Sequence, residues 1–543
     1  MKRLIGVGVG PGDPELVTVK AVRVLREADV VLVPVLAGAD PTAPESQEPG
    51  RAETIIRGYV DAGKIKRLEF ALNDTGGVTP RRAAAWRTAA TAVAREFAGG
   101  AGTVAFGTLG DPNLYSTFSY LAQTVRELVP GVQVQTVAGI TAMQDLASRA
   151  GLSLAEGTEP VTLVPLNGGV AAFEAALNHG GNVVGYKVGA AASPAPQTLR
   201  DRLHQAGRLA DAVIGVRLGL PGEVIAPAAE HLTLTTPDIP YLSTLIIPVR
   251  RPSRGSSLAR ELPETRASDP LQLTRGRVSF VGAGPGAPDL LTLRGAQVIA
   301  AADVVIWASS LVHPDVLAHA RENAEIVDSA RLPMEGVLPY YQRAAREQLS
   351  VARVHSGDPS LWGAIQEQLD QCAALDLDTE IVPGVSSFTA VAARIGRELT
   401  IPEVAQSVIL TRLGGGKTPM PPGEQVAEFA RHGTTMALFL SAARSGQLQD
   451  ELLAGGYPPD TPCVIAYQVT WPDELIVRCA LEDLAASIKE RKLWKHTLVL
   501  VGPALAAGGT RSHLYHPGHF HEYRKADRQA RKQLRDASAQ DGR

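Results

Sequence analysis

IGVGVGPGDPELVT (residues 5–18) and SFVGAGPGAPDLLT (residues 279–292) are two copies of one pattern in this chain of 543 residues. In both copies an apolar run ends in glycines and a proline, and a helical stretch and a second Val-rich run follow. Three further segments recur in the same order: 106–118 with 354–365, 134–147 with 379–392, and 240–249 with 495–504. The repeat length of roughly 250 residues is far longer than that of solenoid repeats, so two whole domains are duplicated.

Short Val- and Ile-rich runs alternate with Ala- and Leu-rich helical stretches in each half, which predicts an α/β fold with mainly parallel sheets. Such sheets bind ligands at the carboxyl ends of their strands, where the Gly-rich segments fall. We expect a first module at 1–252, a linker at 253–275, a second module at 276–508 and a tail at 509–543. Because the linker is polar and rich in Pro, Ser and Arg, the two modules should be separable there.

The charges of the chain are nearly balanced, with 53 Lys and Arg against 56 Asp and Glu. This balance lacks the basic field that binds polyanions, so nucleic acid is not an expected partner. No apolar run approaches the ~18 residues of a membrane span, and a cytoplasmic protein without a membrane partner is expected. Cys372, Cys463 and Cys479 form no CxxC pair, which indicates free thiols in a reducing compartment.

The C-terminal tail contains a histidine cluster at His513, His516, His519 and His521. Metal-binding histidines on a helix prefer a spacing of four residues, and Pro517 and Gly518 interrupt any helix here. No cysteine or carboxylate cluster joins the histidines. We therefore interpret this segment as a solvated His-rich loop and expect no bound metal.

The Gly-rich segment at 8–12 follows a strand and precedes a helix, as dinucleotide-binding loops do. Those loops require an acidic residue about 20 positions later, after the second strand, to bind the ribose. Residues 36–38 (Leu-Ala-Gly) and 309–311 (Ser-Ser-Leu) occupy that place in the two copies. The sequence therefore excludes NAD in both, and Asp13 is interpreted as a helix cap.

Two other loops carry candidate ligand contacts in both halves. Gly-Asp-Pro at 110–112 and at 357–359 ends a buried strand, where glycine allows the backbone to approach a ligand closely. Thr141 and Ser386 each place a hydroxyl ahead of an Ala-rich helix, as a helix cap, a ligand contact or both. The chain has no convincing Ser-His-Asp set, Walker loop or carboxylate pair, so acyl transfer, phosphoryl transfer and glycoside hydrolysis are not indicated.

Together these segments resemble the tetrapyrrole methylase family, whose members use S-adenosylmethionine (SAM) and have two α/β lobes. The first half is similar to precorrin-2 C(20)-methyltransferases in GDPNLYSTFSYL (110–121) and RLGLPGE (217–223). The second half is similar to precorrin-4 C(11)-methyltransferases in HSGDPSLWGAIQEQ (355–368) and ELTIPEVAQSVILTR (398–412). The implied fold class is α/β, with two tandem tetrapyrrole-methylase modules of two α/β lobes each.

The resemblance also implies where ligands bind, with SAM between the two lobes of each half. Its contacts would come from Pro11, Gly110, Asp111, Tyr115 and Thr141 in the first half, and from Pro285, Gly357, Asp358, Trp362, Ser386 and Thr411 in the second. The substrates carry many carboxylates, so basic side chains should line their sites, and our candidates are Lys187, Arg217 and Arg412. Three residues depart from the family pattern, namely Ala138, Ala287 and Trp362, and Ala287 argues against a catalytic role for the Asp that it replaces.

The function implied by the resemblance is a bifunctional C-methyltransferase of cobalamin biosynthesis, with precorrins as its small-molecule partners. Alternatives are another tetrapyrrole substrate (uroporphyrinogen or a cobalt-precorrin), RNA methylation, or one half that is a non-catalytic binding module. Methyl transfer from SAM needs alignment and a dry site more than a strong base, which agrees with the absence of a conventional catalytic motif. The sequence identifies no proton-accepting base and leaves the oligomeric state open, a homodimer included.

Overall fold

The computed structural model describes residues 1–506 except 37–48, 72–79, 179, 191, 234–238, 250–275, 403, 416–418 and 422. The linker at 253–275 and the tail at 509–543, with its histidines, lie outside the described residues.

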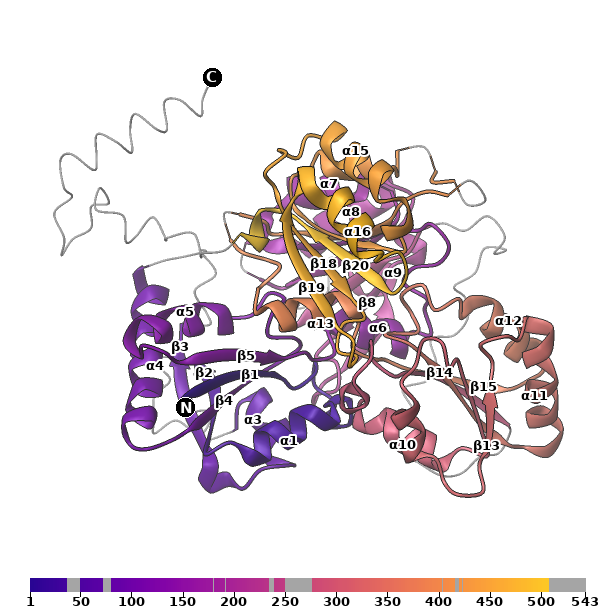
Figure 1. Cartoon of the computed structure of the whole chain (residues 1–543), viewed down its shortest axis with the longest axis horizontal. Coiled ribbons are helices and arrows are strands. Elements are labelled where there is room, and N and C mark those ends of the chain that lie inside the picture. Colours follow the sequence, from indigo (N-terminus) through magenta and orange to yellow (C-terminus); the bar gives the residue numbers. More distant parts are fainter. Residues whose placement is uncertain are drawn as a thin grey trace.

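Each half has an N-terminal lobe built on its own sheet, and the two C-terminal lobes lie together (Figure 1). The two N-terminal lobes flank this shared body on opposite sides.

The first N-terminal lobe is a parallel five-stranded sheet in the order β3-β2-β4-β1-β5. Its strands are β1 (Arg3–Gly8), β2 (Val30–Leu36), β3 (Ile65–Phe70), β4 (Thr103–Thr108) and β5 (Gln133–Val137). Helices α1 (Val19–Glu27) and α3 (Arg51–Arg57) pack on one face, and α4 (Pro80–Ala98) and α5 (Phe118–Leu128) pack on the other. All six residues of β4 are buried, as expected for a strand covered by helices on both faces.

The second N-terminal lobe repeats this plan with the order β13-β12-β14-β11-β15, again all parallel. Its strands are β11 (Arg277–Gly282), β12 (Val304–Trp307), β13 (Glu325–Asp328), β14 (Ser350–His355) and β15 (Asp378–Val382). Its helices are α10 (Leu293–Ala301), α11 (Met334–Glu347) and α12 (Gln366–Ala374). The identical strand order confirms the duplication read from the sequence.

The two C-terminal lobes share one ten-stranded sheet, in the order β19-β18-β20-β17-β16-β6-β7-β10-β8-β9. The first half contributes β6 (Val161–Pro165), β7 (Asn182–Tyr186), β8 (Val213–Val216), β9 (Val224–Pro227) and β10 (Ser243–Ile247). The second half contributes β16 (Val408–Arg412), β17 (Thr435–Phe439), β18 (Pro462–Tyr467), β19 (Leu475–Ala480) and β20 (Thr497–Val501). β6 and β16 pair antiparallel at the centre of the sheet. Read outward from this pair, the five strands of each half follow the same order.

The prediction of mainly parallel sheets is wrong for these C-terminal lobes. Only β6–β7 and β16–β17 run parallel, and the other described pairs of this sheet are antiparallel. The connections from β8 to β9 and from β18 to β19 are short loops, which join antiparallel neighbours but are too short for a parallel crossover. The remaining helices are α6 (Ala142–Arg149), α7 (Val170–Asn178), α8 (Pro196–Gln205), α9 (Ala228–His231), α13 (Ser387–Ile395), α14 (Val426–Ala430), α15 (Ser445–Ala454) and α16 (Leu484–Arg491).

The two halves also share a hydrophobic core. One cluster of buried side chains contains Met143 and Leu146 of α6 from the first half. From the second half it contains Phe388 of α13 and Val385, which precedes that helix. The amide of Val19 donates to the Leu291 carbonyl at 3.0 Å, and the amide of Leu293 donates to the Val17 carbonyl at 2.9 Å. The halves therefore form one interlocked body, which contradicts the expectation that they are independent across the linker. No helix among the described residues is both long and apolar enough to cross a bilayer.

Candidate cofactor and substrate sites

In the first half, three Gly-containing loops meet at the carboxyl ends of β1, β4 and β5. The amide of Gly110 donates to the carbonyl of Gly10 at 2.8 Å. A Cβ on Gly8 would lie 2.7 Å from the Gly139 nitrogen, so a side chain there would push the loops apart. The second half repeats the arrangement, because the amide of Gly357 donates to Gly284 at 2.8 Å. The sequence placed these loops together correctly.

Gly110 and Gly357 form the edge of an open space in each half. Their φ angles are +68° and +66°, a region that glycine adopts without strain. A Cβ added to either residue would meet no atom within 4 Å. The backbone is therefore exposed at the point where the family resemblance predicts contact with SAM, and a ligand can approach it closely.

Asp111 and Asp358 tie the loops together. The Asp111 carboxylate accepts the amides of Gly139 at 2.9 Å and Asn113 at 2.8 Å. Asp358 accepts the amide of Gly384 at 3.1 Å and, from the first half, the side-chain amide of Gln144 at 2.9 Å. Burial raises the pKa of Asp111 to about 7 and also raises the pKa of Asp358. Both carboxyl groups thus hold loops in place, a role that the sequence did not assign to them.

Pro11 and Pro285 are buried where each N-terminal lobe meets its own C-terminal lobe. The carbonyl of Pro285 accepts the indole N–H of Trp471 at 2.8 Å. Asp13 caps the short helix that follows, because its carboxylate accepts the amide of Glu15, and it also pairs with Arg149 at 3.2 Å. This confirms Asp13 as a helix cap, and in the second copy Ala287 takes the N-cap position without a side-chain hydrogen bond.

Tyr115, Lys187 and Tyr186 gather beside the Gly loops of the first half. The Lys187 ammonium lies 5.2 Å from the centre of the Tyr115 ring, and the Tyr115 and Tyr186 ring centres are 5.1 Å apart. Thr141 is the N-cap residue of α6 and forms a capping box with Gln144. Burial lowers the pKa of Lys187, and Arg82 lowers it further. The structure therefore brings Tyr115 and Lys187 together beside the Gly loops of the first half.

Arg217 follows β8 in a loop that packs against the N-terminal lobe. A Cβ on Gly12 would lie 1.9 Å from the carbonyl of Leu218, which shows how closely the two lobes meet here. Burial lowers the pKa of Arg51, and the neighbouring charge of Arg217 lowers it further. Arg51 and Arg82 were missed in the sequence, because each lies on a helix of the N-terminal lobe outside every motif.

In the second half, a hollow of about 330 Å³ contains Trp362 and Arg412. Its other lining residues are Glu156, Gly157, Ala364, Glu367 and Leu440, two of which come from the first half. Arg412 donates to the carbonyl of Gly157 at 2.9 Å. Ser386 is the buried N-cap residue of α13. The buried Nε1 atom of Trp362 and the Oγ1 atom of Thr411 have no hydrogen-bond partner among the described residues, so polar groups remain available to a ligand.

The two halves share a strained backbone pattern around these sites. Tyr115, Lys187 and Arg217 have φ angles of +52°, +59° and +50°. At the equivalent places of the second half, Trp362, Leu440 and Gln468 have φ angles of +55°, +51° and +43°. Residues other than glycine rarely adopt such angles, and they cluster at functional sites when they do.

The strand registers show that the side chains at these equivalent places differ. Pro165 pairs with Tyr186 in the first half, and Arg412 pairs with Phe439 in the second. Lys187 therefore corresponds to Leu440, and Pro165 corresponds to Arg412. The cation lies on a different strand end in each half.

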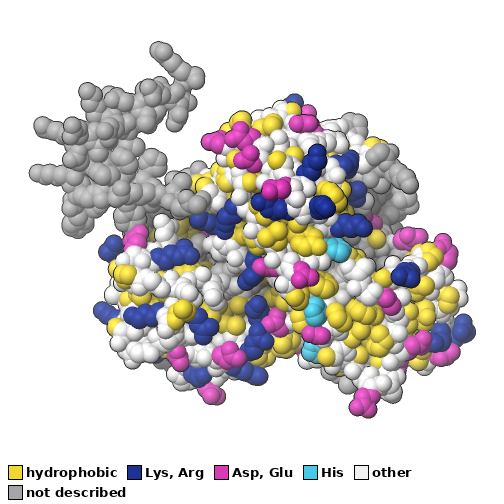
Figure 2. Space-filling model, in the orientation of Figure 1, with side chains coloured by type: hydrophobic (Ala, Val, Ile, Leu, Met, Phe, Trp, Pro, Cys, Tyr) yellow, Lys and Arg dark blue, Asp and Glu magenta, His cyan; other side chains and the backbone are white. Residues whose placement is uncertain are grey.

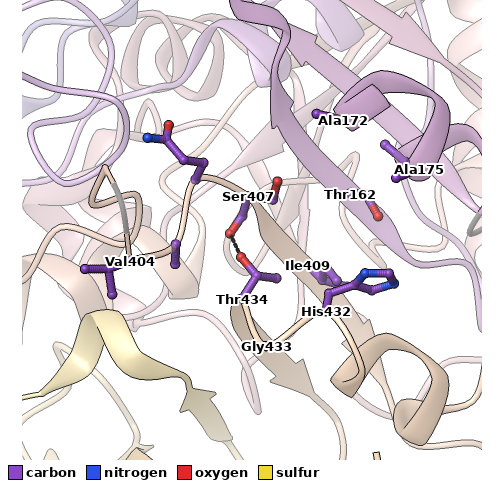
Figure 3. Close-up of a pocket in the computed structure, with 12 residues that line it drawn as sticks. Thr162, Ala172, Ala175, Val404, Ser407, Ile409, His432, Gly433 and Thr434 are labelled. Atoms are coloured by element: carbon purple, nitrogen blue, oxygen red, sulfur yellow. Dashed lines mark hydrogen bonds between the residues drawn. The ribbon is translucent and has the colours of Figure 1, made fainter. Parts of the chain in front are cut away.

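A second hollow of about 270 Å³ lies where β6 and β16 meet, beside α7 (Figure 3). Thr162, Ile409 and His432 line it, and the Thr434 hydroxyl donates to the Ser407 carbonyl at its edge. None of the Gly-containing loops borders it.

The described residues contain no group of three or more His, Cys, Asp or Glu side chains placed to hold a metal ion. Acidic and basic side chains are interspersed over the face shown in Figure 2.

The Tetrapyrrole (Corrin/Porphyrin) Methylases family matches residues 3–231 and again residues 277–485. The chain belongs to this family, and it contains two copies of the family domain. Its methyl donor is accordingly SAM, as the sequence predicted. The matched ranges leave out residues 232–276 and 486–543, which include the linker and the C-terminal tail.

Two similar proteins are each about half as long as this chain. The cobalt-precorrin-4 C(11)-methyltransferase of Methanocaldococcus jannaschii is 43% identical over 251 residues, which cover 46% of this chain and 96% of that protein. The precorrin-4 C(11)-methyltransferase of Mycobacterium tuberculosis is 43% identical over 239 residues, covering 44% and 95%. An X-ray structure of a cobalt precorrin-4 methyltransferase is 39% identical, with a TM-score of 0.42, and covers 44% of this chain and 99% of that one.

Proposed function

We propose that the chain is a bifunctional methyltransferase of the cobalamin pathway. The first half would methylate precorrin-2 at C(20), and the second half would methylate precorrin-4 at C(11). The observation that carries this proposal is the repeated cradle of Gly loops, in which Gly110 and Gly357 each border open space. The C(11) assignment also agrees with the names of the similar proteins, and the C(20) assignment rests on the motifs of the first half.

SAM supplies an activated methyl group on a sulfonium. In the first half, the exposed backbone at Gly110, the Tyr115 ring and the Thr141 region would hold it beside the GPG loop. In the second half, Gly357, Trp362 and Thr411 would do so, and the unpartnered Trp362 Nε1 and Thr411 Oγ1 atoms fit a polar ligand. A dry cradle that fixes the methyl group in line with the attacking carbon supplies most of what such a transfer requires.

The substrate side of each site is defined by cations. Lys187, Arg217, Arg51 and Arg82 surround the first site, and we propose that they bind the carboxylates of precorrin-2. Arg412 lines the hollow of the second site, where burial lowers the pKa of Arg412 and the charge of Arg444 lowers it further. Because the two sets of cations do not coincide, each half should select its own tetrapyrrole.

Mass spectrometry of the products tests this proposal. Purified full-length protein with SAM and precorrin-2 is expected to yield one added methyl group, located at C(20) by NMR of the product. With precorrin-4 as the substrate, the added methyl group is expected at C(11). Methylation of uroporphyrinogen in place of either precorrin would support the alternative substrate and contradict this proposal. A cobalt-precorrin supplied in parallel shows whether the ring is methylated with its metal.

A further inference from the structure

A segment of the second half reaches the first half's site. The amide of Leu399 donates to the carbonyl of Asn113 at 2.9 Å, and the amide of Tyr115 donates to the hydroxyl of Thr400 at 2.7 Å. The Thr400 hydroxyl also lies 3.3 Å from Oε1 of Glu398. These contacts place the Glu398 carboxylate beside the loop that carries Tyr115.

The first half makes the reciprocal contact with the second half's site, but with different side chains. The amide of Ala155 donates to the Ser360 carbonyl, and the amide of Trp362 donates to the Ala155 carbonyl. Gly151 and Gly396 are equivalent, because each lies at the end of the preceding helix, α6 or α13, with a φ angle of +63°. Counted from these glycines, Ser153 corresponds to Glu398 and Ala155 corresponds to Thr400. The residue that the second half contributes is therefore a carboxylate, Glu398, whereas the equivalent residue of the first half is a hydroxyl, Ser153.

Glu398 is buried, with an exposed fraction of 6%. Burial raises its pKa to about 7, and a hydrogen bond with Ser119 and the charge of Lys187 oppose this rise. The groups that face it are Lys187 after β7, Tyr115 and Ser116 before α5, Ser119 in α5 and its own neighbour Thr400. A carboxylate in this environment changes its charge near neutral pH, which suits a general base.

The two proposed reactions differ in their need for a base. C(20) is a bridging carbon that carries one hydrogen, so this hydrogen must leave after the methyl group is attached. C(11) is bonded to three atoms of the ring skeleton, and methyl addition leaves no hydrogen on it. The site with the buried carboxylate is therefore the site whose reaction must remove a proton from carbon.

We propose that Glu398, supplied by the second half, accepts the C(20) proton in the first half's site. This inference rests on the proposed function. C(20) forms a bond to the methyl group while the bond from sulfur to that group breaks, which releases S-adenosylhomocysteine. The C(20)–H bond then breaks, its electron pair restores the ring double bond, and the proton passes to the Glu398 carboxylate.

Glu398→Gln in the full-length protein tests the proposal. Removing a positioned general base typically slows a reaction 10²–10⁴-fold, and we expect a loss of about this size in kcat for precorrin-2. Methylation of precorrin-4 should be unchanged. In the wild type, the rate with precorrin-2 should fall as the pH drops below about 7, because Glu398 must be ionised to accept the proton. The Gln variant should lack this dependence and show a larger isotope effect with deuterium at C(20).

Glu424→Gln is the matched control. Glu424 is another buried carboxyl group of the second half that contacts the first, where it accepts the amide of Gly181 at 3.0 Å. Its replacement should leave both activities and both pH profiles unchanged. A role of Glu398 in folding alone would lower the melting temperature and the affinity for S-adenosylhomocysteine without changing the isotope effect.

The outcomes separate this proposal from the proposed function. A wild type that does not methylate precorrin-2 overturns the proposed function. A wild type that methylates it with a rate independent of pH around 7 overturns the role of Glu398 alone, whether or not the variants fold. The same holds if Glu398→Gln keeps the wild-type rate. Glu398→Asp keeps a carboxylate, so it should retain the pH dependence at a reduced rate.

Discussion

Expressed as separate proteins, residues 1–252 and 276–543 are each expected to fail to persist as soluble monomers. Separation would expose the edges of β6 and β16, which pair antiparallel in the intact chain. Unpaired strand edges with apolar surroundings associate or aggregate. It would also expose Met143, Leu146, Val385 and Phe388 of the shared core. Size-exclusion chromatography with light scattering would measure the state of each half, alone and after co-expression.

Co-expressed halves should recover as a complex containing one copy of each. The control is the full chain with a protease site inserted between 253 and 275, which should stay associated after cleavage because the contacts between the halves do not depend on that segment. Soluble, monomeric halves that each bind S-adenosylhomocysteine would contradict the shared sheet.

Gly357→Val is expected to lower methylation of precorrin-4 while leaving methylation of precorrin-2 unchanged, and Gly110→Val should do the reverse. The added side chain would enter space that is open in the structure and that we assign to SAM. A displacement of about 1 Å can reduce a rate on the order of 100-fold, and we expect losses of at least this order. Steady-state rates with each precorrin would measure the effect.

Both substitutions also strain a backbone with positive φ, so the control must carry the same strain. Gly131 and Gly456 have φ angles of +78° and +101°, and a Cβ on either would meet no atom within 4 Å. Both residues are exposed and lie outside the proposed sites. Gly131→Val and Gly456→Val should therefore match the change in melting temperature and retain both activities. Loss of both activities in stably folded Gly357→Val would indicate a single shared site.

The sequence predicted the parts of this structure that are determined locally. A glycine with positive φ, a proline in a loop and a hydroxyl before a helix are recognisable from a few neighbouring residues, and the Gly loops lie where they were expected. The duplication, the parallel N-terminal sheets and the helix cap at Asp13 are likewise confirmed. The antiparallel strands of the C-terminal lobes were missed because apolar runs alone do not reveal strand direction.

The features that depend on distant residues could not be read from the sequence. Glu398 belongs to a motif that identified the second half, yet its side chain lies beside Ser119 and Lys187 of the first half. The carboxylates of Asp111 and Asp358 accept the amides of Gly139 and Gly384, which lie more than 20 residues away along the chain, and the sequence did not reveal these contacts. The polar linker predicted separable modules, and only the strand order reveals that β6 and β16 join them.

The central claim is that this one chain contains two working SAM sites. Titration of the full-length protein with S-adenosylhomocysteine in a calorimeter tests it most directly. We predict two sites per chain, with Gly110→Val and Gly357→Val each removing one of them. A single site per wild-type chain would contradict the claim, because one of the two halves would then lack its cofactor.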